Sequence, residues 1–362
     1  MENNLPIVKE RPQNFYDFII VGQGLAGTLL HFCLRQEGRQ VLVIDKNEGN
    51  ASRVAAGMFN LVIGRRLSLA WRAKETSIAA DSIYTSLEKY LSSEFYHKKP
   101  IVRIFASEDD FLINQQKFKD TETAEYIKHF SKDEYIEGLK NASFGICEIK
   151  NGGYLDTQTL LQGYRNKLAE SGNLLQDNFD FDALLLNDGG IAYKGIKAKK
   201  IIFCEGYQAI YNPYFSWLPF NLAKGDVLTI EAPGLQTEKI INKGIYIVPL
   251  RKGLFKVGAT YQWQMLDVSP TAEARQELET ELQKLIDVPY RILAHEAGIR
   301  PTVKQRRPFL GLHPEYKKIG IFNGLGTRGV ILAPLLAQEM AAHIIHGKPL
   351  HKETDISFYN YT

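Results

Sequence analysis

The sequence predicts an α/β protein of two domains, one built on a parallel sheet and the other, an α+β domain, on an antiparallel sheet. A length of 362 residues favours more than one hydrophobic core. Two glycine-rich loops each follow an apolar run and precede a helical pattern, which predicts parallel strands with crossover helices. Residues 225–260 contain short alternating or apolar runs separated by Gly and Pro, which predict the antiparallel strands.

The first glycine-rich loop lies near the N-terminus. Residues 18–21 are continuously apolar, as expected of a strand buried on both faces. Gly22, Gly24 and Gly27 complete the pattern G-x-G-x-x-G, and residues 25–36 continue with helical periodicity. Such glycines provide, in order, a tight turn, close approach of the backbone to a pyrophosphate, and close packing of helix on strand. The helix N-terminus offers unpaired N–H groups and a positive dipole end to phosphate.

A second strand and an acidic residue complete this unit. Gly38 ends the helix, and residues 41–44 form another apolar run that stops at Asp45. Asp45 lies eighteen residues beyond Gly27, where a carboxylate can accept hydrogen bonds from an adenosine ribose. Strand, glycines, helix, strand and acid together predict a Rossmann-type dinucleotide-binding domain.

A second G-x-G-x-x-G match, Gly324 to Gly329, follows the apolar strand 319–322. It does not predict a second nucleotide site, because the helix 330–345 is followed only by a short polar tail without a further strand. We expect this loop and helix to close on the first nucleotide site instead. Pro334 near the start of the helix is expected to cost little, and Gly347 can cap its end.

The C-terminal helix also bears on the identity of the dinucleotide. Its N-terminus suits the N1–O2 edge of a flavin, where negative charge accumulates on reduction. A nicotinamide ring gains no such charge. The sequence therefore favours FAD over NAD.

Bulk composition excludes several classes of protein. The formal charge is +3, from 44 basic and 41 acidic residues, which predicts no nucleic-acid or membrane-surface partner. Cys33 and Cys204 fall in a helical pattern and an apolar strand, as expected of reduced core residues. Residues 1–14 lack an apolar signal region, and no apolar run approaches the roughly 18 residues of a membrane span. We expect a cytoplasmic protein.

Along most of its length the chain resembles the superfamily of D-amino-acid oxidase, glycine oxidase and sarcosine oxidase. The resemblance implies FAD as the cofactor. It rests on motifs in a conserved order: Ala55-Ala-Gly-Met58, the helix 157–169, Lys200-Ile-Ile-Phe-Cys-Glu-Gly206, Lys224-Gly225, Tyr246-Ile-Val-Pro249, Val257-Gly-Ala-Thr260, Gly298-Ile-Arg-Pro301 and Gly326-Thr-Arg-Gly-Val-Ile-Leu-Ala-Pro334.

The resemblance implies a discontinuous FAD-binding domain of residues 1–60, 150–215 and 297–362, and a substrate domain of residues 61–149 and 216–296. It also implies noncovalent binding, since the cysteine that links flavin in sarcosine oxidase has no counterpart near Lys304. The cofactor-binding residues predicted in this way are Gly22, Gly24, Leu25, Ala26, Gly27, Asp45, Lys46, Ala55, Ala56, Gly57, Met58, Gly206, Gly326, Thr327, Arg328, Gly329 and Val330.

The implied reaction is hydride transfer from the C–N bond of a small amino acid or secondary amine to flavin N5, with oxygen or another acceptor. Arg300 is the candidate clamp for a substrate carboxylate, because a guanidinium matches it bidentately. The alternative for Arg300 is an interdomain ion pair. Tyr246 is a candidate second donor, and Arg328 contacts either the ring, the substrate or solvent. Other functions left open are a hydroxy-acid dehydrogenase, an oxidase of a modified tRNA nucleoside, and a flavin-bound binding module.

Some segments depart from the family pattern. An acid usually follows Arg-Pro, whereas here residues 302–307 read Thr-Val-Lys-Gln-Arg-Arg. Residues 60–71 and 101–149 match nothing, and we expect them to form part of the substrate pocket. Tyr261 and Trp263 are candidates to line that pocket or to pack on a strand. A helix from Ser269-Pro270 to about residue 286 is expected, with the serine as N-cap.

Overall fold

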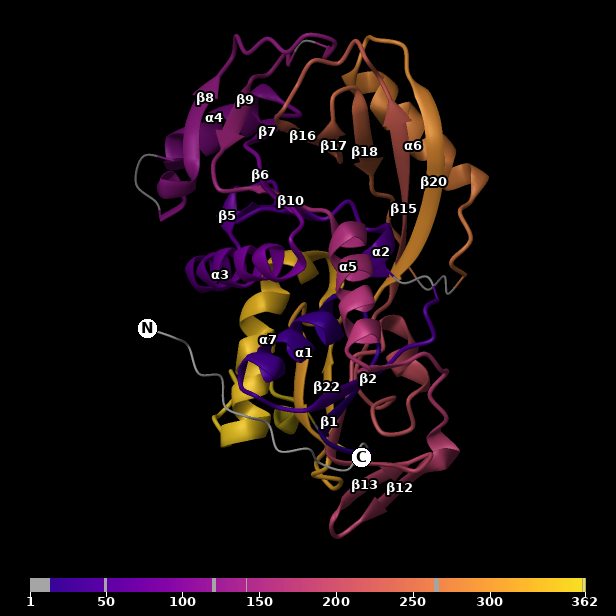
Figure 1. Ribbon diagram of the computed structural model, residues 1–362. Helices are drawn as coiled ribbons and strands as arrows, with labels where there is room; N and C mark the ends of the chain where they lie inside the picture. Colours follow the sequence, from indigo (N-terminus) through magenta and orange to yellow (C-terminus); the bar gives the residue numbers. More distant parts are fainter. Residues whose placement is uncertain are drawn as a thin grey trace, which may run out of the picture.

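The protein is described here by a computed structural model of residues 14–48, 51–118, 122–140, 142–263, 267–359 and 361. The expectation about a missing signal region falls on the N-terminal residues, of which only Asn14 is described. Two large sheets organise the chain, one in the lower and one in the upper half of Figure 1. The three cysteines are free and buried, as expected for two of them.

An eight-stranded sheet forms the lower half of the molecule. Its strands span Phe15–Val21 (β1), Val41–Ile44 (β2), Leu174–Leu175 (β11), Leu184–Asn187 (β12), Gly190–Tyr193 (β13), Ile196–Phe203 (β14), Phe309–Leu312 (β21) and Ile319–Asn323 (β22). Strands β11, β2, β1, β14 and β22 run parallel in that order, and β13, β12 and β21 are antiparallel additions. This is the predicted Rossmann-type domain.

Four helices accompany this sheet (Figure 1). They span Leu25–Gln36 (α1), Ala73–Leu91 (α3), Thr157–Glu170 (α5) and Gly329–His346 (α7). Helix α7 packs against both α1 and α3, and α5 packs against α1. Gly347 adopts φ +68° and donates its amide to the last turn of α7, which confirms the predicted cap. Helix α3 lies in a range that we assigned to the second domain, yet it packs on α7.

The position of Pro334 differs from the expectation. Helix α7 begins at Gly329, so Pro334 lies in its second turn rather than at its start. Its missing N–H leaves the carbonyl of Val330 without its helical donor. The hydroxyl of Tyr84, on α3, donates to that carbonyl at 2.6 Å. A tertiary contact therefore compensates a defect that the sequence suggested would cost little.

The expectation that no apolar run is long enough to span a membrane needs a correction. The segment Gly326–His346 is long and apolar enough, by length and composition, to cross a membrane. In this fold α7 contributes ten buried residues to the core, between α1 and α3. Core packing accounts for its apolar composition.

A nine-stranded sheet forms the upper half. Its strands span Ile101–Ile104 (β7), Ile127–Ser131 (β8), Ile146–Ile149 (β9), Ala223–Glu231 (β15), Ile240–Lys243 (β16), Ile245–Arg251 (β17), Leu254–Gly258 (β18), Gln262–Trp263 (β19) and Arg291–Arg300 (β20). The order is β19-β15-β18-β17-β16-β7-β9-β8, with β20 also paired to β15. All pairs are antiparallel except β16 with β7.

Helix α6, Ala272–Leu285, covers one face of this sheet. Its N-cap is Thr271, whose side chain accepts the amide of Ala274 at 3.2 Å. The predicted cap at Ser269 is therefore wrong by two residues. Leu278 and Leu282 are fully buried against the sheet, as the helical period requires.

The remaining helices and strands lie outside the two large sheets. They span Ala51–Val54 (α2), Met58–Phe59 (β3), Val62–Ile63 (β4), Ser68–Leu69 (β5), Tyr96–Lys98 (β6), Glu108–Phe118 (α4), Glu122–Tyr126 (η1), Gly153–Leu155 (β10), Phe181–Ala183 (η2), Gly206–Tyr211 (η3), Gly326–Arg328 (η4) and Ile356–Phe358 (η5). Strands β3, β10 and β6 form a small sheet, and β4 pairs with β5.

Candidate active site

One cavity of about 870 Å³ lies where the two sheets meet. Its lining comes from the N-terminus of α1, the end of β2, helix α2, strands β15, β17 and β20, and the loop before α7. Every residue that the sequence predicted to bind the cofactor lines this cavity, except Gly27, and so do the substrate candidates Arg300 and Tyr246. Its position, beyond the carboxyl ends of parallel strands, is where α/β sheets bind ligands.

At two positions of the first motif, neighbouring backbone atoms leave room only for glycine. Gly22 has φ +101°, and a Cβ on it would lie 2.5 Å from the carbonyl oxygen of Cys204. A Cβ on Gly27 would lie 1.9 Å from the carbonyl oxygen of Gly22. No side chain fits at either position. The predicted tight turn and close helix–strand packing are both present.

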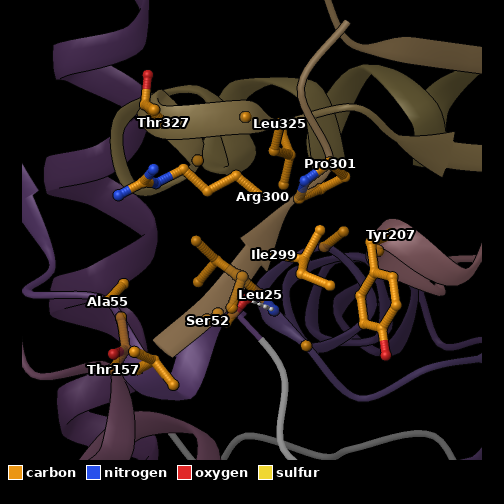
Figure 2. A pocket seen from close by; sticks show the side chains of 18 of the residues that line it. Leu25, Ser52, Ala55, Thr157, Tyr207, Ile299, Arg300, Pro301, Leu325 and Thr327 are labelled. Carbon is orange, nitrogen blue, oxygen red and sulfur yellow. Dashed lines mark hydrogen bonds between the residues drawn. The ribbon is translucent and has the colours of Figure 1, made fainter. Parts of the chain in front are cut away.

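The N-terminus of α1 points into the cavity without an acidic residue or a side-chain cap of its own. The amide of Leu25 donates to the hydroxyl of Ser52 at 3.2 Å, a bond visible in Figure 2. Ser52 lies on α2, and no sequence motif predicted this contact. Backbone N–H groups at a helix N-terminus favour an anion, which fits the diphosphate of a dinucleotide.

Asp45 lies at the end of β2 and is held from three sides. It accepts the amides of Gln23 at 2.8 Å and Asn47 at 2.9 Å. Arg165, on α5, forms an ion pair with it at 2.7 Å, and the side chain of Arg165 is 6% exposed. These partners fix the carboxylate at the cavity wall. The neighbouring Lys46 lines the cavity beside it and pairs with Glu48.

Glu205 lies after β14, and no role was predicted for it. Burial raises the pKa of Glu205 to about 7, and a hydrogen bond from Asn212, 2.7 Å long, opposes that rise. Among the described residues no cation pairs with Glu205. A carboxyl at this edge of the dinucleotide cavity is therefore poised between its neutral and charged forms near neutral pH.

The second glycine motif faces the same cavity as the first. Gly326, Gly329 and Val330 line it together with Leu25. A Cβ on Gly329 would lie 3.5 Å from the side chain of Leu25, which shows how closely the two loops approach. The expectation that the C-terminal loop closes on the N-terminal unit agrees with this arrangement.

Arg300 ends β20 and extends its guanidinium into the cavity (Figure 2). Its Nη1 donates to the carbonyls of Lys224 at 3.3 Å and Thr260 at 3.2 Å. The guanidinium carbon lies 4.7 Å from the ring centre of Tyr261. It also lies against the Cα of Gly225, since a Cβ there would be 1.9 Å from Nη2. These contacts hold the fork in one place, and Nε and Nη2 have no acceptor among the described residues.

Arg300 has no carboxylate partner among the described residues within ion-pair distance. The interdomain ion pair, the alternative to a substrate clamp, is therefore absent from the described part of the chain. Tyr246 is half-buried in the same cavity. Burial raises the pKa of its hydroxyl, and the positive charge of Arg300 opposes that rise. The hydroxyl therefore lies within reach of the electrostatic field of Arg300.

Arg328, in η4, is the second guanidinium in the cavity. Burial lowers its pKa, and the charges of Arg306 and Arg307 lower it further. The described residues provide it with no ion pair. Two guanidinium groups therefore face one cavity without neutralising acids.

Residues 60–71 and 101–149, which match no family motif, contribute less to the cavity than expected. From residues 60–71 only Asn60 and Ile63 line the cavity, and no described residue of 101–149 does. Instead β7, β8 and β9 extend the far edge of the upper sheet. Tyr261 lines the cavity, whereas Trp263 does not and is half exposed, with its ring centre 5.2 Å from that of Tyr261. The expected contribution of 101–149 to the pocket is wrong, because strand pairing takes that segment away from the site.

Comparisons with known proteins agree with this geometry. Residues 17–343 match the family described as FAD dependent oxidoreductase. Glycine oxidase of Bacillus subtilis (strain 168) is 23% identical over 349 residues, 88% of this chain and 90% of that protein. The bifunctional tRNA 5-methylaminomethyl-2-thiouridine biosynthesis protein MnmC of Burkholderia mallei (strain SAVP1) is 24% identical over 386 residues, 94% of this chain and 58% of that protein. A crystal structure of glycine oxidase from Geobacillus kaustophilus superposes with a TM-score of 0.77 at 21% identity, covering 97% and 99% of the two chains.

Proposed function

The chain belongs to the family of FAD-dependent oxidoreductases, and on that premise we propose that it oxidises the C–N bond of a small amine or amino acid bearing a carboxylate. The observation that carries the proposal is the guanidinium of Arg300, which faces the cavity with two nitrogens from which no described residue accepts a hydrogen bond. A planar guanidinium binds a carboxylate bidentately, which orients the rest of the ligand.

The cavity fits FAD as the cofactor. Gly22, where a Cβ would clash with Cys204, and the open N-terminus of α1 together form a cradle for a diphosphate. Asp45 would hold the adenosine ribose, and Gly329 and Val330, which line the same cavity, would contact the flavin. A bound FAD would supply the two-electron acceptor that the oxidation requires, with flavin N5 as the proposed hydride acceptor.

The residues of the chain have positioning roles in this proposal. Arg300 holds the substrate carboxylate, with Tyr246 as a second donor, so that the α-carbon of the substrate has one orientation. Removal of hydride from that carbon and loss of the N–H proton give an imine, which water hydrolyses to a carbonyl compound and an amine. The acceptor that reoxidises the cofactor is oxygen or another oxidant.

Anaerobic flavin reduction tests the proposal. The purified holoprotein is mixed without oxygen with glycine, sarcosine, D- and L-amino acids, and matched hydroxy acids such as glycolate and lactate. Bleaching of the flavin band by an amine supports C–N oxidation, and hydrogen peroxide release on readmission of air identifies an oxidase. Bleaching by hydroxy acids alone would replace the proposal with a hydroxy-acid dehydrogenase. A flavin that no compound of the panel reduces would favour a binding module.

A second candidate follows from the relative that acts in tRNA modification, which matches 94% of this chain. Lys304 and Arg306, in the loop after Arg300, are exposed, and the described residues pair neither of them with an acid. Unfractionated tRNA is therefore added to the same anaerobic assay. Bleaching by tRNA, but by no free amine, would favour this candidate.

A further inference from the structure

The site of Arg300 is complete for one carboxylate without further cations. Backbone carbonyls of Lys224 and Thr260 fix one nitrogen, and Tyr261 and Gly225 hold the plane of the guanidinium. Nε and Nη2 then present one edge with two donors, which matches the two oxygens of a carboxylate. Tyr246 adds a third donor from β17. A single carboxylate held there would leave Arg328 without an acidic partner among the described residues.

Arg328 lines the same cavity from another part of the chain, η4. No acid among the described residues neutralises its charge. It is half-buried, and its charged neighbours are two more cations, Arg306 and Arg307. Arg307 pairs with Glu353 at 2.7 Å, but Arg306 has no ion pair among the described residues. A cation placed among cations in a partly dry site is unfavourable unless a ligand brings negative charge.

The acids that line the cavity do not supply that charge. They lie at the ends of β2, β11 and β14, on the dinucleotide side, and most already have cationic partners. Asp45 pairs with Arg165, Glu48 with Lys46 and Asp177 with Lys194, while Glu205 is bound by Asn212. The segment after Arg300-Pro301 adds to this imbalance, because Lys304, Arg306 and Arg307 bring cations and residues 302–307 contain no acid.

We propose that the substrate is an amine with two carboxylates, one held by Arg300 with Tyr246 and the other by Arg328. The inference rests on the proposed function and specifies its substrate class. A substrate of this class brings one carboxylate for each of the two cavity guanidinium groups, Arg300 and Arg328, that pair with no acid in the described part of the chain. Glycine or a simple N-alkyl glycine brings a single carboxylate, and is expected to be a poorer ligand.

A binding experiment tests the inference independently of turnover. Malonate, succinate and glutarate are titrated into the oxidised holoprotein against acetate, propionate and butyrate at constant ionic strength, and the perturbation of the flavin spectrum gives each Kd. At least one dicarboxylate is expected to bind tenfold or more tightly than its monocarboxylate homologue. Arg328→Gln should reduce that ratio to about one, and Arg328→Lys should keep part of it. Arg306→Gln is the matched control, because it removes an equal charge from outside the cavity lining and should leave most of the ratio.

A turnover experiment uses iminodiacetate and its monoamide, which has the same shape with one carboxylate replaced. The parent should reduce its flavin tenfold or more efficiently with iminodiacetate, and Arg328→Gln should lose that preference. Equal binding of mono- and dicarboxylates by the parent would overturn the inference, because one carboxylate would then satisfy both guanidinium groups. A strong dicarboxylate preference without flavin reduction by any amine would instead refute the proposed function and leave the paired anion site standing.

Discussion

Gly225→Ala is expected to disable Arg300 without removing its charge. The new Cβ would lie 1.9 Å from Nη2, 2.2 Å from Cζ and 2.3 Å from Nη1 of Arg300. Contacts this short do not occur, so the guanidinium must leave its place. The backbone of Gly225 lies in a regular strand, β15, where alanine is tolerated. The substitution therefore tests the placement of the fork rather than its presence.

The size of the effect follows from the bonds that the displaced guanidinium gives up. It loses the carbonyls of Lys224 and Thr260, and with them the orientation of its free edge toward the cavity. Hydrogen bonds to a charged group contribute roughly 1.5–3 kcal/mol, which corresponds to about a ten- to hundredfold loss of kcat/KM. Arg300→Ala should lose as much or more, and Arg300→Lys should recover only part, since an ammonium has no fork.

The assay is the rate of anaerobic flavin reduction as a function of substrate concentration, with FAD content measured for each variant. Gly163→Ala is the matched control, because a Cβ there meets only the side chain of Leu91 at 3.5 Å, away from the cavity. If Gly225→Ala acts through Arg300, adding it to Arg300→Ala should cost little more. Losses that simply add, or a Gly225→Ala enzyme within twofold of the parent, would refute the reasoning.

Acid precipitation should release the flavin into the supernatant, and a yellow pellet would contradict noncovalent binding. Asp45→Ala should weaken FAD retention by about 1–3 kcal/mol, since ribose hydrogen bonds to a charged acceptor are lost; fluorescence titration of the apoprotein measures this, and an unchanged Kd would dismiss the ribose contact. Tyr84→Phe should lower the free energy of urea unfolding by about 1–3 kcal/mol, because the carbonyl of Val330 is left unsatisfied. Pro334→Ala in that background should restore part of the loss by supplying an N–H, and a failure to do so would assign the loss to packing. Because burial raises the pKa of Glu205 from 4.5 to about 7, the folded apoprotein holds a proton that the unfolded chain releases, so stability should fall as pH rises across that window. Glu205→Gln should flatten this dependence, and an unchanged profile would show that another group causes it.

The fold was predictable where the evidence is local. Strand β2 spans residues 41–44 and α1 spans residues 25–36, both as periodicity and glycine placement indicated. Boundaries that depend on one hydrogen bond were less predictable, as the cap at Thr271 rather than Ser269 shows. Propensity cannot distinguish two neighbouring hydroxyl residues, because the choice depends on how the preceding loop meets the sheet.

For the candidate site, the glycine motifs and the family resemblance pointed to residues that do line the cavity, but they missed others such as Ser52 and Glu205. A glycine needed for a positive φ, as at Gly22, or for backbone contact, as at Gly27, is visible in one short segment because its constraint is local. Tertiary structure alone decided the partners. Arg165 meets Asp45 across 120 positions, and the plane of Arg300 rests on a glycine in another strand. Such contacts depend on the packing of segments far apart in the chain, and no periodicity within a single segment encodes which side chains will meet.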